Sequence, residues 1–303
     1  KRRETLFANK DKAILSKKLV TLKDDVPVKE NLDSFILKDI KKDKLFDFLR
    51  DMEFNRLLSL VISFYGESET KDSSKKFKNS EKLGKKINTK NYECIIDEKN
   101  LDKWVKTLSE KEIIAVDTET SSLNALETNL VGISFSYGDN NACYIPLEHK
   151  KGKSLKKELV LKKIKPILED SSIKKIGQNI KFDFIVLKKY GVEISPIEDT
   201  MLISYTLDAG SNRHNMDTLS EIHLGHKTIS FKDLVGSGKN KLNFTDIDLD
   251  KATEYAAEDA DITFRLYQHL KERLDYEKLN KIYEYFEKPM IKILSKLEFN
   301  GIK

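Results

Sequence analysis

The stretch "KEIIAVDTETSSL", residues 111–123, decides the fold. Its apolar residues 113–116 run directly into Asp117 and Glu119, as in a buried strand that ends in two carboxylates. Successive side chains on a strand point to opposite faces, so these two carboxylates share one face. They repel each other unless a positive charge lies between them. The stretch therefore indicates either an oxygen-ligand metal site, which suits Mg²⁺ or Mn²⁺, or a strand that ends in a solvated acidic turn.

The pattern after residue 92 alternates between short apolar strands and amphipathic helices. This alternation predicts an α/β domain whose mixed sheet lies between helices. Asp97 or Asn100 is the expected cap of the first helix of this domain. The expected elements are strands at 92–97, 112–120 and 173–179, a hairpin over 130–147 with its turn at 138–141, helices at 100–110 and 154–169, and further helices to about 275.

Composition divides the chain into four parts. Residues 1–65 contain two helical patterns, one over 1–23 and one over 43–64, and predict a small helical segment. Residues 66–91 are rich in lysine and poor in large apolar side chains, so we expect a flexible linker. Residues 92–275 carry the candidate chemistry. Residues 276–303 predict a C-terminal helix that is interrupted at Pro289 and is cut short by the end of the chain.

Overall composition limits the class of protein but not its function. The 303 residues are 39% hydrophobic and 35% charged, with a formal net charge of +5. This balance predicts a soluble globular protein and is compatible with nucleic acid without requiring it. No apolar run reaches the roughly eighteen residues of a membrane helix, so we expect no membrane span. The chain does not begin with Met, which suggests a fragment or a processed chain.

Two further carboxylates lie at ordered positions. Asp183 closes the stretch "GQNIKFD", residues 177–183, near a predicted strand-to-helix turn, where a helix N-cap is the competing explanation. Asp259 lies on the predicted helix "YAAEDAD", residues 255–261, one turn after Tyr255, so the two side chains share a face. A single helical Asp is usually solvated, which is the alternative here. Glu258 and Asp261 are expected to point elsewhere.

Together these side chains match what two-metal phosphodiester hydrolysis requires. Two cations held by carboxylates stabilise the attacking and leaving oxygens, and one of them lowers the pKa of a bound water. A tyrosine hydroxyl within hydrogen-bond reach can orient the attacking oxygen. No Ser-His-Asp, Cys-His or P-loop pattern competes, because the residues "GSGKN" at 236–240 lack the P-loop spacing.

Three stretches resemble the motifs of the DEDD 3′→5′ exonucleases, in the variant that has a tyrosine before the last aspartate. These are "VDTET" at 116–120, "GQNIKFD" and "YAAEDAD". The stretches 198–221 and 226–244 extend the resemblance to the proofreading region of the bacterial DNA polymerase I family (family A). The N-terminal segment resembles the end of a 5′-nuclease region and its connector, and the last helix resembles the start of a polymerase domain.

The resemblance implies a ribonuclease-H-like fold and a role for each residue of the motifs. Asp117, Glu119 and Asp259 would hold the metal that activates water. Asp117 would also bridge to a second divalent ion, Mg²⁺ or Mn²⁺, which Asp183 would support. Tyr255 would position the nucleophile.

The same resemblance implies contacts to DNA. Leu123 and Phe231 match apolar contacts to the terminal bases. Thr120, Gln178, Asn179 and Arg213 match polar contacts to the last nucleotides, with phosphate as the expected partner of Arg213. The substrate would be a single-stranded or frayed 3′ end of DNA, and the product a nucleoside monophosphate. We expect a monomer in the bacterial cytosol, at the nucleoid.

Three alternatives remain open from the sequence. An RNA-trimming nuclease of the ribonuclease D type shares the carboxylates. A DNA-positioning domain can keep the fold without turnover. A truncated exonuclease can also be inactive because the polymerase domain that delivers the primer end is missing.

Overall fold

The computed structural model describes residues 2–27, 35–36, 40–52, 54–66, 87–236 and 242–301. Contacts divide the chain into two compact units, Lys1–Ser73 and Ser74–Lys303, which are taken separately below. Most of the predicted linker lies outside the described residues, so that prediction is left as an expectation.

The first unit is helical in its described parts. Both predicted helices are wrong in their extent, because each is divided into two. The side chain of Asn9 donates to the carbonyl of Thr5, and an Asn that binds nearby backbone favours a helix end. The N–H of Phe54 reaches back to the carbonyl of Leu49, which ends the second helical ladder. The helices are α1 (Arg2–Ala8), α2 (Lys10–Val20), α3 (Lys42–Asp51) and α4 (Asn55–Tyr65).

The second unit is built on a mixed six-stranded sheet with the order β1-β4-β3-β2-β5-β6. Strand β2 pairs antiparallel with β3, which pairs antiparallel with β4, whereas the pairs β1–β4, β2–β5 and β5–β6 are parallel. The sequence did not indicate β6, whose three residues are too few for a pattern. The strands are β1 (Glu93–Cys94), β2 (Ile113–Thr120), β3 (Leu130–Ser136), β4 (Ala142–Pro146), β5 (Lys174–Gly177) and β6 (Ile197–Asp199).

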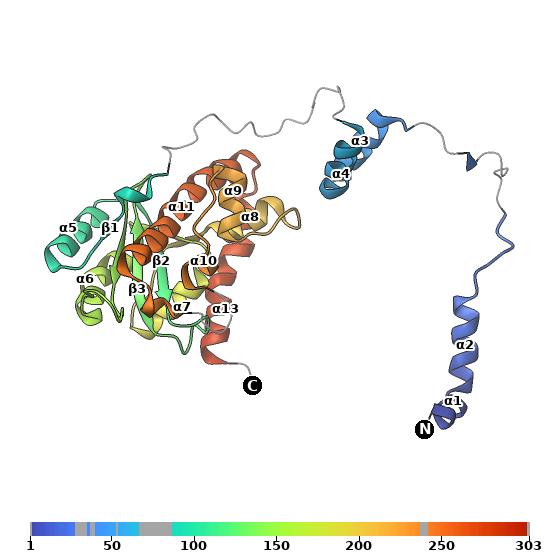
Figure 1. Cartoon of the computed structure of the whole chain (residues 1–303), viewed down its shortest axis with the longest axis horizontal. Coiled ribbons are helices and arrows are strands. Elements are labelled where there is room, and N and C mark those ends of the chain that lie inside the picture. The colour runs from blue at the N-terminus through green and yellow to red at the C-terminus, as the bar shows by residue number, and fades with distance from the viewer. Residues whose placement is uncertain are drawn as a thin grey trace. The chain divides into compact units, whose positions relative to one another are not determined.

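Helices cover both faces of this sheet, and α11 crosses one of them (Figure 1). The predicted cap is confirmed for Asp97, whose side chain accepts a hydrogen bond from the N–H of Asn100. The helices are α5 (Glu98–Ser109), α6 (Lys157–Glu169), α7 (Lys181–Lys189), α8 (Thr200–Asp208), α9 (Met216–Leu224), α10 (Phe231–Val235), α11 (Leu249–Tyr276), α12 (Asn280–Ile282) and α13 (Lys288–Asn300). The predicted α/β fold, a mixed sheet between helices, is confirmed.

Strand β2 is central and buried on both faces. Ile114 and Val116 pack into a core with residues of α5, α6, α7 and α13. Ala115 packs into the opposite core with residues of α8, α9 and α11. The uninterrupted apolar run of β2 follows from this double burial, and the face of Ala115 continues into Asp117 and Glu119.

The C-terminal helical stretch differs from its prediction. A π-helical turn, Tyr283–Glu287, precedes Pro289, and Pro289 lies in the first turn of α13. Proline is tolerated there because the first N–H groups of a helix have no partner within the helix. Among the described residues, no helix combines the length and apolar composition needed to cross a membrane.

Candidate active site

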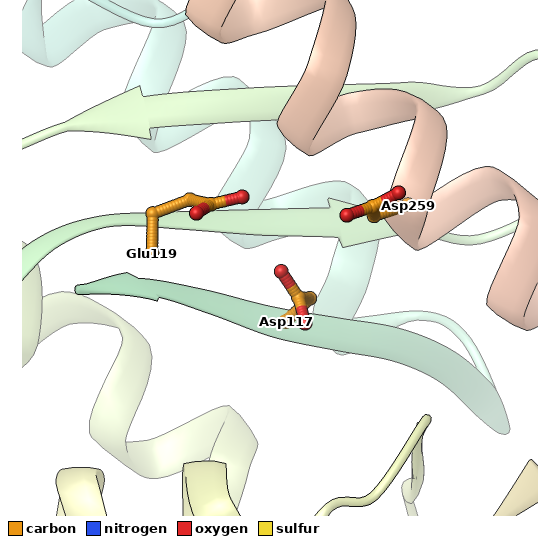
Figure 2. Close-up of side chains that lie close together, drawn as sticks. All are labelled: Asp117, Glu119 and Asp259. Carbon is orange, nitrogen blue, oxygen red and sulfur yellow. The ribbon is translucent and has the colours of Figure 1, made fainter. Parts of the chain in front are cut away.

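Three carboxylates converge where β2 ends beneath α11. Asp117 and Glu119 extend from β2 and Asp259 from α11, with their carboxyl groups turned toward one another (Figure 2). One oxygen from each residue lies within 4.8 Å of the others. The predicted shared face of Asp117 and Glu119 and the predicted approach of Asp259 are therefore present in the structure.

Small residues allow close packing around Glu119 on the sheet and around Asp259 on α11. Gly132 of β3 lies opposite Glu119, and a Cβ at Gly132 would be 2.0 Å from the hydroxyl oxygen of Tyr144. Ala256 and Ala260 of α11 are fully buried. The sequence pattern of small residues around Asp259 thus reflects close packing of helix on sheet.

Burial and mutual repulsion dominate the electrostatics of the three carboxylates. Burial raises the pKa of Asp117 to about 6. The pKa of Glu119 rises well above its usual value through burial, and then through the charges of Asp117 and Asp259. Burial raises the pKa of Asp259 as well, followed by the charge of Asp117. A cluster of this kind is stable in its ionised form only with compensating positive charge.

The donor set fits a hard divalent cation. All the candidate ligands are carboxylate oxygens, which suit Mg²⁺ or Mn²⁺. The Oε1 atom of Glu119 is buried and has no hydrogen-bond partner among the described residues. An orphaned buried carboxylate oxygen is costly unless a ligand satisfies it.

Asp183 reaches the same region from the first turn of α7. The N-cap of α7 is Ile180, so the capping explanation for Asp183 is wrong. Its Oδ1 instead accepts hydrogen bonds from the N–H and the hydroxyl of Thr118, at 2.9 and 2.5 Å. Burial raises the pKa of Asp183, as does the charge of Asp117, although Asp183 lies outside the closest group of three.

Tyr255 lies beside Asp259 within a row of aromatic rings. Its ring centroid is 6.0 Å from that of Phe231 and 6.0 Å from that of Phe244. Burial and then the negative charge of Asp259 raise the pKa of Tyr255, so its hydroxyl keeps its proton at neutral pH. The ring is thus held by its neighbours, and the hydroxyl is a hydrogen-bonding group rather than a base.

These side chains form the floor of a cavity of about 580 Å³. Leu123 and Phe231 belong to its lining and are 93% and 41% exposed. Exposed large apolar side chains beside a polar floor suit a ligand that has both apolar and charged parts. The remaining lining includes Thr120, Ser122, Gln178, Asn179, Phe182, Leu242, Asn243 and Phe244.

The predicted polar contacts have different surroundings. Gln178 is engaged inside the protein, because its Nε2 donates to the carbonyl of His214 and its Oε1 accepts from the hydroxyl of Thr200, at 2.7 and 2.5 Å. Asn179 is exposed and has a positive φ of 59°. Arg213 is exposed but is not part of the cavity lining.

Several residues that shape this site escaped the sequence analysis. Asp199 is buried and accepts backbone hydrogen bonds from Asn179, Ile180 and Met201, so it ties the turn before α7 to the start of α8. An aspartate before a helical pattern is a capping signal, but the second turn that it binds is distant in sequence. Thr118 gave no signal of its own.

Comparison with known proteins places this site in a family. Residues 92–275 match the 3′–5′ exonuclease family of DNA polymerase A. The DNA polymerase I of Rhizobium leguminosarum is 35% identical over 379 residues, covering 100% of this chain and 37% of the relative. The chain belongs to the DNA polymerase A 3′–5′ exonuclease family. This family consists of metal-dependent hydrolytic nucleases, so the predicted family and enzyme class are confirmed. The chain spans about a third of the length of the curated relatives that it matches.

Solved structures share the fold of the exonuclease family. The NrnC of Brucella melitensis is 26% identical, with a TM-score of 0.52 over 69% of this chain and 93% of that one. Escherichia coli RNase D, an exoribonuclease involved in structured RNA processing, is 16% identical, with a TM-score of 0.53 over 70% of this chain and 51% of that one. The RNA-trimming alternative therefore shares the fold, whereas the family match is to polymerase exonuclease domains.

Proposed function

We propose that this chain removes nucleotides from the 3′ end of single-stranded or frayed DNA, as the proofreading part of a DNA polymerase I. The observation that carries the proposal is the group of three carboxylates, Asp117, Glu119 and Asp259, at the floor of a cavity with two exposed apolar side chains. Such a floor suits a phosphodiester, and such walls suit the bases on either side of it.

Two divalent ions, Mg²⁺ or Mn²⁺, are the proposed cofactors. Asp117, Glu119 and Asp259 would hold the first ion, and Asp117 with Asp183 the second. When bound, the ions would lower the pKa of a water and stabilise charge on the attacked phosphate and the leaving oxygen. The hydrogen bonds from Thr118 fix the Oδ1 of Asp183 and so orient its carboxylate toward the site.

The side chains of the chain itself orient the reacting groups. The protonated hydroxyl of Tyr255 would hydrogen-bond the attacking water and align it with the terminal phosphorus. The water oxygen forms a bond to phosphorus while the bond from phosphorus to the O3′ of the preceding nucleotide breaks. The products are a nucleoside 5′-monophosphate and a shortened strand with a free 3′ hydroxyl.

The DNA end would be held mainly through contacts that do not depend on sequence. Leu123 and Phe231 would contact the terminal bases, and Thr120 and Asn179 the last nucleotides. Arg213, which is exposed, would meet phosphate. Gln178 also lines the cavity and would contact the last nucleotides, while its amide donates to the carbonyl of His214 in the loop that carries Arg213.

Preferential removal of mismatched 3′ nucleotides would follow from the requirement for a single-stranded substrate. A mismatched 3′ end unpairs at a lower free-energy cost than a matched one, so a site that accepts only unpaired nucleotides removes errors first. Residues 92–275 are the proposed exonuclease domain, 1–65 the end of a 5′-nuclease region with its connector, 66–91 the linker and 276–303 the start of a polymerase domain. We place the protein, as a monomer, in the bacterial cytosol, because its relatives are bacterial DNA polymerases.

The experiment that tests this proposal compares four substrates with Mg²⁺. They are single-stranded DNA, duplexes with a matched or a mismatched 3′ terminal nucleotide, and single-stranded RNA of the same sequence. We expect rapid release of monophosphate from single-stranded DNA and faster release from the mismatched than from the matched duplex. Faster release from RNA would support the ribonuclease D alternative. Binding of DNA without release would support a DNA-positioning domain or a truncated enzyme.

A further inference from the structure

Glu258 lies directly before Asp259 on α11, yet its carboxylate serves a different part of the structure. It is 1% exposed, and both of its oxygens have partners. Its Oε1 lies 2.8 Å from the Nε2 of His226, and its Oε2 accepts a hydrogen bond from the N–H of Ile229 at 2.7 Å. The mechanism proposed above does not use this buried acid.

Its two partners belong to the segment between α9 and α10, residues 226–231, which we call the wall segment. The segment ends in Phe231, the first residue of α10, and Phe231 lines the cavity. It has no helical or strand hydrogen bonds before α10, so its contacts with residues of neighbouring elements determine its position. Besides Glu258, they include the hydroxyl of Ser220, which donates to the carbonyl of His226 at 2.9 Å.

The charge of Glu258 adds to the negative charge around Asp259 when no cation is bound. After burial and Asp117, Glu258 is the next cause of the raised pKa of Asp259. A neutral side chain of similar size would fill the same space without this repulsion. A carboxylate, however, accepts stronger hydrogen bonds from N–H donors than a neutral group does, and two such contacts hold a segment without regular structure. The carboxylate of Glu258 therefore suits the two contacts that it makes to the wall segment.

We propose that Glu258 is a positioning residue for the DNA end, because it holds the wall segment so that Phe231 faces the terminal base beside Tyr255. This inference rests on the proposed function. It gives the two neighbouring acids of α11 separate tasks: Asp259 takes part in the metal site, and Glu258 fixes one wall of the cavity. Removal of Glu258 should therefore act through Phe231 and change how tightly the end is bound more than how fast it is cleaved.

A double-mutant cycle between Glu258→Ala and Phe231→Ala measures this dependence. The readouts are kcat and KM for release of the terminal nucleotide from single-stranded DNA. Loss of one base contact to an aromatic ring is expected to raise KM about tenfold in either single variant. We expect kcat to stay within about twofold, and the double variant to be no worse than Phe231→Ala alone.

Two other variants keep the test decisive if Glu258→Ala folds poorly. Glu258→Gln retains an acceptor for the N–H of Ile229 and is expected to restore most of the affinity. His226→Ala removes one of the two contacts at a side chain that is 27% exposed, so it should fold and raise KM by an intermediate amount. The matched control is Asp261→Ala, which removes a buried acid of the same helix that binds Tyr92, Asn140 and Arg265 instead. This control should lower the melting temperature and leave KM unchanged.

Additive effects of Glu258→Ala and Phe231→Ala, or an unchanged KM in Glu258→Ala, would overturn the inference. The same cycle is repeated on the Kd of a labelled single-stranded oligomer in an Asp117→Asn background. If the unaltered chain binds DNA but releases no nucleotide, the proposed function fails, and the cycle on Kd still decides the role of Glu258. If it neither binds nor cleaves, both proposals fail.

Discussion

The Oδ1 atom of Asp183 accepts hydrogen bonds from both the N–H and the hydroxyl of Thr118. The parallel pairing of β2 with β5 ends at Ala115, so β5 provides no partner for the N–H of Thr118. Asp183 satisfies this donor and is itself fixed by it. A residue on the face of β2 opposite to Asp117 thereby orients the carboxylate that we propose for the second metal ion.

Substitution Thr118→Val tests this relationship, because it removes the hydroxyl and keeps the shape of the side chain. Loss of a hydrogen bond to a ligating carboxylate typically costs about tenfold or more in metal affinity or activity. We expect a decrease of about tenfold in kcat, with a melting temperature close to that of the unaltered chain. Mg²⁺ titration of activity is the measurement, and an unchanged midpoint together with an unchanged kcat would contradict this role.

Metal binding should depend on pH in a defined direction. Because burial raises the pKa of Asp117 to about 6, a cation must displace a proton below that pH. Apparent affinity for Mn²⁺ is therefore expected to fall as the pH decreases from about 7 to about 5. Calorimetry in two buffers of different ionisation enthalpy would detect the released proton, and an affinity that does not vary over this range would contradict the account.

The metal-free protein should show the opposite dependence in its stability. The folded-state pKa of Asp117 lies above its unfolded value of 3.8, so folding is favoured by proton uptake. This contribution to the free energy of unfolding is fully present below the unfolded pKa and is lost as the pH rises through about 6. Urea denaturation in EDTA is the measurement, with Asp117→Asn as the control that lacks this contribution.

Tyr255→Phe distinguishes the contribution of the hydroxyl from that of the ring, because it removes the hydroxyl and keeps the ring. The ring still packs between Phe231 and Phe244, so the fold and KM should change little. Loss of the group that aligns the water is expected to lower kcat by about ten- to hundredfold. Single-turnover cleavage measures this directly. A variant with full kcat would mean that the hydroxyl has no part in alignment.

Gly132→Ala tests the packing of β3 against the side chain of Tyr144. The added Cβ would lie 2.0 Å from the hydroxyl oxygen of Tyr144, so the Tyr144 ring or the strand must shift. Overpacking in a core typically costs about 1–3 kcal/mol. We expect a loss of that order in the free energy of unfolding, measured with urea, and lower activity because Glu119 lies opposite Gly132. An unchanged stability would show that Tyr144 moves freely.

Local sequence patterns were sufficient to predict the central strand and the shared face of the two carboxylates on it. The alternation of faces along β2 placed Asp117 and Glu119 together, and helical spacing placed Tyr255 one turn before Asp259. The contacts of Gln178, Asp199 and Glu258 could not be predicted in this way. Each binds backbone groups from a segment distant in sequence, and no periodicity encodes which segment packs beside it. The wrong extents of the N-terminal helices have a local cause, because the side-chain hydrogen bond of Asn9 and the backbone hydrogen bond of Phe54 lie where the helices end, although the apolar pattern continues.

The most direct test of the central claim is the cleavage of a 5′-labelled single-stranded DNA oligomer with Mg²⁺, by this chain and by Asp117→Asn. We expect a ladder that shortens from the 3′ end for the unaltered chain and no cleavage in EDTA. For the variant we expect a rate reduced by a factor of about a thousand or more, since the lost carboxylate serves both proposed ions. The variant should also melt at a higher temperature in EDTA, because its substitution removes repulsion within the buried cluster. Equal cleavage by the two proteins, or cleavage that persists in EDTA, would contradict the account.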